Sequence, residues 1–97
     1  MENEEKSKEE ILAQFTQNEK GQYVHKLKEP IQWGSEEITE FVLDKPKAKH
    51  IRKMPAKPGM DAVLNIIGKL ANQSNSVIDE LGLEDMNILS EYFAAFN

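Results

Sequence analysis

The chain has 97 residues and a net charge of −5, a length that suits one domain with a modest core. This acidic balance argues against nucleic acid as the main partner, because extended binding to phosphates needs an excess of positive charge. The chain contains no cysteine, which excludes disulfides and thiolate zinc sites, so we expect packing alone to stabilise the fold.

Residues 1–20 are mostly Glu, Lys, Asn and Gln, a composition that buries too little apolar surface to offset the entropy of ordering. We therefore predict a flexible charged tail over residues 1–20. Within it, Ser7 and Glu10 form a capping-box pattern ahead of Ile11 and Phe15, which predicts a short helix. Such a short helix is marginal unless it docks on the rest of the domain.

The first ten residues carry acids where a secretory signal has a basic start and an apolar stretch. No window of the sequence approaches the roughly 18 consecutive apolar residues of a membrane-spanning helix. We therefore expect a cytoplasmic protein that does not contact a membrane.

Alternating apolar residues predict a β unit over residues 22–44. Gly34 supplies a turn, and the run ITEFVL at 38–43 is rich in the β-branched and aromatic residues that favour strands. We expect the face that carries Thr39, Phe41 and Leu43 to be covered and the opposite face to be half exposed. Pro30 lacks a backbone donor, so it belongs at an edge or at a break between strand segments.

Helical patterns fill residues 46–97. The first helix is expected from Pro46 to about Arg52, and the run MPAKPG at 54–59 then predicts a linker. A longer helix is expected to begin near Met60, with an apolar stripe formed by Met60, Val63, Ile66, Ile67 and Leu70.

Two further helical segments follow the polar run NQSNS. Ser76 and Asp79 form a capping pattern for a short turn, and Gly82 then begins the last helix. That helix has an apolar stripe made of Met86, Leu89, Tyr92, Phe93 and Phe96. The elements together predict an α+β fold: a small antiparallel β-hairpin or three-strand sheet followed by three to four helices, in one domain over residues 21–97.

No residue pattern indicates catalysis, a metal or a cofactor, so we do not expect an enzyme. His25 and His50 have no nucleophile or second ligand linked to them by a sequence pattern, so we expect both to be structural or surface residues. Glu36, Glu37 and Glu40 are interpreted as the solvated rim of a hairpin. The glycines are isolated, and no phosphate-binding loop is present.

Positive charge gathers in the middle of the chain, where residues 45–60 hold six basic residues and no acidic one. Three interpretations of this strip stay open: a solvated face near the acidic segments, a dock for an acidic protein, or a contact for phosphates. The strip has no interleaved aromatic residues for stacking on bases, which weakens the last of these.

Aromatic residues supply the other candidates for partner binding. Trp33 beside the hairpin turn either covers the sheet or forms an exposed contact. Three aromatic residues near the end of the chain exceed what one helix stripe requires, so one of them is expected to face a partner. The candidate partner-binding residues are therefore Trp33, Lys47, Lys49, Arg52, Lys53, Tyr92 and Phe96.

The order of these motifs resembles a known family. Leu27, Pro30 and Ile31 form an aliphatic-proline-aliphatic strand, and Gly34 follows it as a turn. The strand TEFVL at residues 39–43 comes next, and the charged residue Lys45 then precedes Pro46. An acidic residue, Asp85, then precedes an aromatic-ended last helix. In these features the chain resembles the tail assembly chaperones of Mu-like contractile-tailed phages and prophages, over roughly residues 23–96.

The resemblance implies a non-catalytic protein that holds the tape-measure protein until tail-tube subunits polymerise around it. Its implied partners are the tape-measure protein and the tail-tube protein, and self-association is also open. The alternative from another functional class is a small nucleic-acid-binding regulator that uses the strip over residues 45–57.

Overall fold

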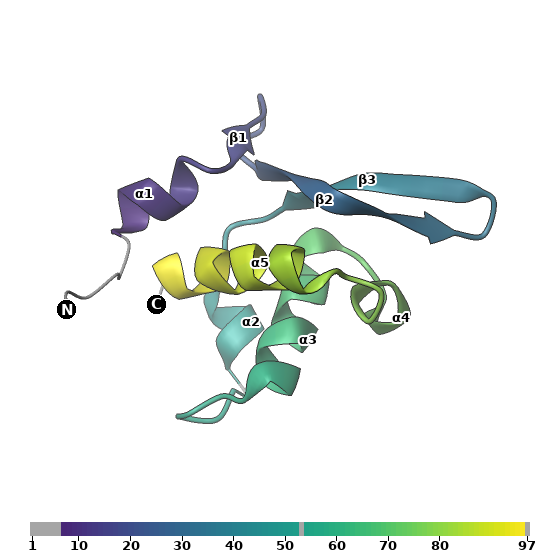
Figure 1. Ribbon diagram of the computed structural model, residues 1–97. Coiled ribbons are helices and arrows are strands. Elements are labelled where there is room, and N and C mark those ends of the chain that lie inside the picture. The colour runs from purple at the N-terminus through teal and green to yellow at the C-terminus, as the bar shows by residue number, and fades with distance from the viewer. Residues whose placement is uncertain (1–6, 53, 97) are drawn as a thin grey trace, which may run out of the picture.

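In the computed structural model, residues 7–52 and 54–96 are described, and they form an α+β fold with a three-strand antiparallel sheet (Figure 1). The predicted fold class is therefore confirmed. Along the chain the elements are α1 Lys8–Leu12, β1 Thr16–Gln17, β2 Tyr23–Trp33, β3 Glu36–Leu43, α2 Ala48–Ile51, α3 Met60–Ala71, α4 Asn75–Ile78 and α5 Leu83–Ala95.

The predicted hairpin across Gly34 is formed by β2 and β3. Gly34 has φ of 65°, a left-handed conformation that only glycine adopts without steric cost, and this allows the tight reversal. The sheet order is β1-β2-β3, so β2 is the central strand, but β1 pairs only with its first two residues. Beyond those residues no other strand of the described chain pairs with this edge of β2, and the hairpin projects past the helices (Figure 1).

The hairpin is irregular around Pro30. The pairing register shifts between Lys26 and Ile31, so this part of β2 has more residues than the facing part of β3. Pro30 therefore lies in a break of the ladder, as its missing donor predicts. The shift pairs Ile38 with the buried Ile31, and Thr39 is exposed, so the prediction that Thr39 shares the covered face was wrong.

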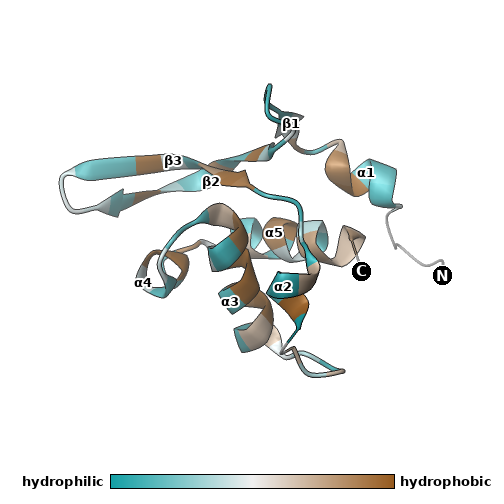
Figure 2. Cartoon of the chain, turned by 180° about the vertical axis from the view of Figure 1, so that it is seen from behind, coloured by the Kyte–Doolittle hydropathy of each residue, from teal (hydrophilic) through white to brown (hydrophobic). Residues whose placement is uncertain are grey.

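The helices cover one face of the sheet, and α3 and α5 lie against it in Figures 1 and 2. Phe41 and Leu43 of β3 are fully buried there, and each contributes about 1.5–3 kcal/mol by leaving water. The hairpin is hydrophobic along its middle and mostly hydrophilic toward its tip (Figure 2). Buried apolar side chains of the core are Ile11, Phe15, Leu27, Ile31, Phe41, Leu43, Ile66, Ile67, Leu70, Ala71, Val77, Ile78, Leu89, Tyr92 and Phe93.

The N-terminal segment joins this core from residue 7 onward. The predicted capping box is present, because Glu10 N donates to Ser7 Oγ and Ser7 N donates to Glu10 Oε1. Ile11 and Phe15 are both buried, and α1 packs on α5. The docking that so short a helix needs is thus provided by Ile11 and Phe15, with Leu12 packed against the same core. Residues 1–6 of the expected tail lie outside the described residues.

The predicted helix from Met60 is confirmed as α3, and the polar run after it ends the helix. Asn72 adopts a left-handed conformation with φ of 56°, and Gln73 N donates to Gly68 O at 2.8 Å, which is a Schellman-type cap. The cap of α4 is Ser74, whose Oγ accepts from Val77 N. The prediction that Ser76 caps this turn was therefore wrong by two residues.

Gly68 allows α4 to lie close to α3. A Cβ at this position would come within 3.1 Å of Gln73 O and 3.3 Å of an Ile78 side-chain carbon. Helix α2 is shorter than the predicted segment from Pro46 to Arg52, because Lys47 is its N-cap and it ends at Ile51. The helix from Gly82 is confirmed as α5, with Gly82 as its N-cap.

Candidate partner-binding surfaces

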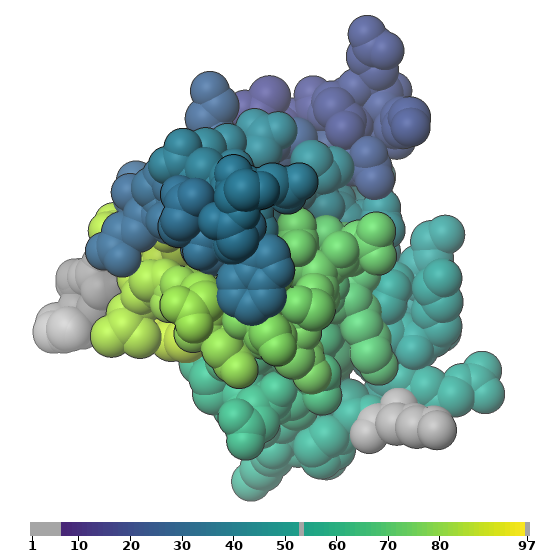
Figure 3. Space-filling model, turned by 90° about the vertical axis from the view of Figure 1, so that its right-hand side faces the viewer, coloured from purple at the N-terminus to yellow at the C-terminus, as the bar shows by residue number. Residues whose placement is uncertain are grey.

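Trp33 lies at the last position of β2, where it pairs with Glu36. Its side chain is 40% exposed, so of the two predicted roles the structure places it as an exposed residue of the hairpin rather than as a cover for the sheet. Figure 3 shows the molecule from the end toward which the hairpin points, with the hairpin above the residues of α4 and the start of α5. Trp33 is therefore an aromatic residue that is accessible near the tip of the hairpin.

Three further large apolar side chains among residues 7–52 and 54–96 are exposed. Leu83 at the start of α5 is 73% exposed, and Ile51 and Met60 at the facing ends of α2 and α3 are also exposed. Met60 begins the predicted apolar stripe of α3, and as the first residue of the helix it is exposed, whereas Ile66, Ile67 and Leu70 of the stripe are buried. Exposed large apolar residues are common singly, but each is a place where a partner could remove apolar area from water.

The basic strip surrounds α2. Lys47, Lys49 and Arg52 are all exposed, whereas Lys53 lies outside the described residues. Lys49 and Arg52 border a hollow of about 380 Å³ between α2 and α3, and Lys69 of α3 borders it from the other side. The structure thus brings most of the predicted basic candidates to one surface.

Tyr92 lies in the core instead of on the surface. Its side chain is fully buried, and its hydroxyl donates to the backbone carbonyl of Asp44 at 2.9 Å. Its ring contacts those of Phe15, Tyr23 and Phe96, with centroids 5.1–5.7 Å apart. Burial raises the pKa of the Tyr92 hydroxyl far above its ordinary value, so this group is a fixed hydrogen-bond donor.

Phe96, the other C-terminal candidate, is half-buried. One side of its ring packs on Tyr23 and Tyr92, and the Lys8 ammonium lies 4.7 Å from the ring centroid. Phe96 therefore closes the aromatic cluster and retains some accessible surface. Of the candidates from the last helix, it is the one that can meet a partner in the described structure.

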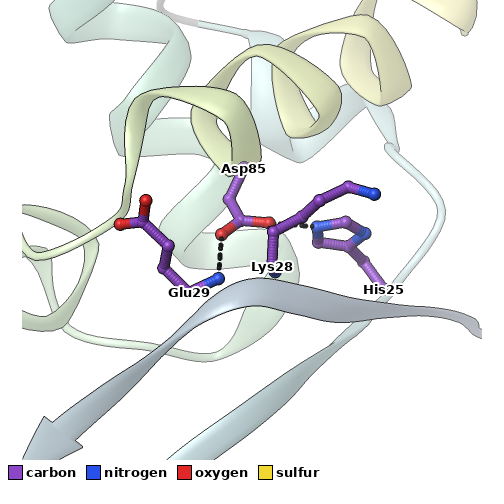
Figure 4. Close-up of polar contacts among 4 residues, drawn as sticks. All are labelled: His25, Lys28, Glu29 and Asp85. Carbon is purple, nitrogen blue, oxygen red and sulfur yellow. Dashed lines mark hydrogen bonds and ion pairs between the residues drawn. The ribbon is translucent and has the colours of Figure 1, made fainter.

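The most constrained polar site is the contact between Asp85 and β2, which Figure 4 shows. Asp85 lies in the first turn of α5 and is fully buried. One carboxylate oxygen accepts from His25 Nε2 at 2.8 Å and from Lys28 N at 2.9 Å, and the other accepts from Glu29 N at 3.1 Å. We call these four residues the Asp85 junction.

The junction repairs the break in the β-ladder. Between Lys26 and Ile31 the register shift leaves backbone donors of β2 without partners on β3, and the Asp85 carboxylate accepts two of them. Pro30 has no N–H that needs a partner. Burial alone would raise the pKa of Asp85, but the bonds from Lys28 N, His25 and Glu29 N together hold that pKa below its ordinary value.

The sequence did not predict the contact between His25 and Asp85. His25 was expected to be structural or at the surface, and Asp85 entered only through the family resemblance. One signal was present, because a polar His25 on the inward face of a strand requires a buried partner, and Asp85 at a helix start is well placed to be one. The junction joins β2 to α5, and both carboxylate oxygens of Asp85 accept hydrogen bonds from β2.

The described ranges 7–52 and 54–96 contain no group of three or more His, Cys, Asp or Glu side chains positioned to hold a metal ion. Within the same ranges, every helix is too short or too polar to cross a bilayer. The candidate binding features of the described residues are therefore three surfaces: the hairpin tip with Trp33, the basic residues around α2, and the accessible part of Phe96.

Comparison with known proteins identifies the family. The family model described as phage tail assembly chaperone proteins E, 41 or 14 matches residues 24–97, which include β2 from its second residue, β3 and all the helices from α2 to α5. No curated protein and no solved structure matches the chain. The match supports a chaperone role and does not favour the nucleic-acid-binding regulator as the alternative. The chain belongs to the phage tail assembly chaperone family.

Proposed function

We propose that this chaperone binds the tape-measure protein of its phage or prophage in the bacterial cytoplasm and keeps it soluble until the tail tube assembles. The proposal takes family membership as its basis. It adds a physical role: the chain covers apolar surface of a long helical client and performs no reaction of its own.

One observation supports the proposed physical role, which is to cover apolar surface of a client. The exposed large apolar side chains Trp33, Ile51, Met60 and Leu83 lie at the ends of secondary-structure elements, where a partner can reach them. An amphipathic helix of a client would remove part of this apolar area from water, at roughly 25 cal/mol for each Å² buried. Scattered contacts of this size give weak binding per copy.

Weak binding per copy suits a temporary partner. Several copies arranged along one long client protect it by their combined occupancy, while each copy still exchanges. Tail-tube subunits that bind the same client more tightly would then displace the chaperone. We therefore propose the tail-tube protein as the competitor that releases the client.

The proposal is tested by producing the tape-measure protein of the same phage or prophage with and without this chain. We expect the client to be insoluble alone and soluble with the chaperone, and to co-purify with it. A client that stays insoluble beside an equal amount of folded chaperone would contradict the proposal.

Matched variants locate the apolar contacts. Trp33→Ala and Leu83→Ala should each lower the yield of soluble client, because both side chains are exposed and leave the core unchanged. Gln32→Ala and Glu84→Ala remove the exposed polar neighbours and serve as controls. Equal yields from the apolar and the polar variants would show that these apolar residues do not bind the client.

A further inference from the structure

The cations around α2 that the structure describes have no ion-pair partner among the other described residues. We name as the α2 strip the described residues Lys45, Lys47, Lys49, Arg52 and Lys57, all of which are exposed. Within residues 7–52 and 54–96, no carboxylate forms an ion pair with any of them. The nearby carboxylate of Asp44 accepts instead from Gln22 Nε2 at 2.8 Å. The acidic residues in the described part of the chain therefore do not neutralise the α2 strip through ion pairs.

The strip borders a hollow that has both polar and apolar walls. The cations Lys49, Arg52 and Lys69 lie along the hollow of about 380 Å³, which we call the α2 hollow. Met54, Ala62 and Ile66 contribute apolar atoms to the same hollow. A cationic border around an apolar floor fits a ligand that has an apolar side and negative charges beside it.

A second hollow continues this surface around α2. It has a volume of about 300 Å³ and shares Lys49 and His50 with the first. Lys20, Lys45 and Lys47 add three more cations to its lining, and Asp44 adds one carboxylate. The two hollows make a basic surface longer than a single side chain or small ion needs. A segment of polypeptide, rather than an isolated anion, matches this extent.

The lowered pKa of His50 agrees with positive charge gathered around α2. Burial is the main cause that holds the pKa of His50 below its ordinary value, and the positive charge of Lys49 is the next. Lys47 and Lys69 act in the same direction, whereas the negative charge of Asp44 opposes them. His50 Nδ1 accepts from Lys47 N at 2.8 Å, which holds the imidazole at the start of α2.

We propose that the α2 hollow and the α2 strip bind an acidic amphipathic helix of a partner protein. The apolar side of that helix would lie on Met54, Ala62 and Ile66, and its carboxylates would pair with Lys49, Arg52 and Lys69. The inference rests on the proposed function in one respect: the helix is taken to be a segment of the tape-measure client.

A protein segment fits this surface better than nucleic acid does. No Phe, Tyr or Trp ring is among the described residues that line either hollow, so bases have no stacking surface. The apolar floor offers nothing to a phosphate backbone, and the net charge of −5 repels a long polyanion.

The direct test uses model peptides of about 20 residues, a length above that at which isolated helices are marginal. One peptide carries a Leu stripe with Glu on the polar side, a second has the same composition in scrambled order, and a third has Lys in place of Glu. Fluorescence anisotropy of each labelled peptide measures binding. We expect the acidic amphipathic peptide to bind most tightly, and its binding to weaken as salt rises.

Variants of the chain locate the binding. The double variant Lys49→Glu and Arg52→Glu should weaken binding of the acidic amphipathic peptide about tenfold or more, since it replaces two attractions by two repulsions. Ala62→Glu places a carboxylate in the hollow and should act in the same direction. The control, Lys26→Glu with Gln32→Glu and Thr39→Glu, changes the net charge equally at exposed positions of the β2–β3 hairpin and should leave binding within about twofold.

Several results would overturn the inference. Equal losses in the test and control variants would show a net-charge effect without a site. Duplex DNA that binds at the same salt as tightly as the peptide, with the same dependence on Lys49 and Arg52, would show a phosphate site. Self-association abolished by the Lys49→Glu and Arg52→Glu variant in sedimentation experiments would show that a second copy occupies the surface.

Failure here is distinguishable from failure of the proposed function. If the Lys49→Glu and Arg52→Glu variant still keeps the tape-measure protein soluble, the inference is overturned while the chaperone proposal stands. If the wild-type chain does not keep the client soluble, the chaperone proposal fails whatever the peptides show. Circular dichroism checks that each variant is folded, which we expect because both substituted residues are exposed.

Discussion

Two charged regions of this molecule differ in how their charges are satisfied. At the Asp85 junction one buried carboxylate accepts three hydrogen bonds from β2. On the α2 strip five exposed cations have no ion pair with any carboxylate in the described part of the chain. The junction is closed within the domain, whereas the strip is open to an external partner.

The difference separates structural charge from charge available for binding. A buried carboxylate that has all its partners inside the domain holds elements together, and its loss should be measured as stability. Exposed cations beside an apolar hollow contribute little to folding, and their loss should be measured as binding. The predictions that follow test this separation, beginning with the junction.

The largest effect is expected for Asp85→Ala. It leaves Lys28 N, Glu29 N and the His25 imidazole without their acceptor, so we expect a loss of about 3 kcal/mol or more in the free energy of unfolding. Urea denaturation followed by circular dichroism measures it. Asp79→Ala, at an exposed carboxylate beside α4, is the control and should change stability by less than about 0.5 kcal/mol. A loss below 1 kcal/mol for Asp85→Ala would contradict the role of the junction.

The junction should also make the fold sensitive to acid. Because the folded-state pKa of Asp85 lies below its ordinary value of 3.8, its stabilisation is complete above that pH and is lost as the pH falls through the lowered pKa. Unfolding free energies of the wild type and Asp85→Asn, measured from neutral pH downward, test this. The variant should lose less stability than the wild type on acidification, and parallel curves would argue against the assignment.

A smaller effect is expected at the other end of α5. Tyr92→Phe removes the donor to the Asp44 carbonyl at a fully buried position, which should cost about 1–2 kcal/mol. Tyr23→Phe is the matched control, because no hydrogen bond from the Tyr23 hydroxyl is present in the described structure, and it should be nearly neutral. Similar losses for the two variants would mean that the Tyr92 hydroxyl is not what holds the end of β3.

The smallest stability effect is expected on the strip. Lys49→Gln should change the free energy of unfolding by no more than about 0.5 kcal/mol, because Lys49 is exposed and has no ion pair among the described residues. It should also raise the pKa of His50, since the positive charge of Lys49 is one cause of its lowering. NMR titration of the His50 ring protons measures this, and an unchanged or lower pKa would be inconsistent with the proposed field.

The regular elements could be predicted from the sequence because local rules determine them. Gly34 at a turn, β-branched residues at 38–43 and the apolar stripe from Met60 each carry a local signal. The face assignment of Thr39 failed because it assumed a strict two-residue period, and the extra residues of β2 around Pro30 alter the pairing. A register shift depends on contacts between two strands, which a one-strand pattern does not contain.

The candidate surfaces were only partly predictable for a related reason. The clustering of Lys47, Lys49 and Arg52 follows from their closeness in sequence, but the contribution of Lys69 to the same hollow depends on the packing of α2 against α3. Likewise, an aromatic stripe does not specify which ring is enclosed. Tyr92 is buried because Phe15 from the N-terminal segment packs on it, and that contact joins residues far apart in sequence.

The most direct test of the central claim is an NMR titration of the ¹⁵N-labelled chain with soluble peptides from the tape-measure protein. Amide resonances of residues 47–52, of the hairpin tip near Trp33 and of Leu83 should shift on binding, while those of Lys28 and Glu29 should not. Shifts confined to the Asp85 junction, or no shift with any peptide, would contradict the claim that the open surfaces of this molecule receive its client.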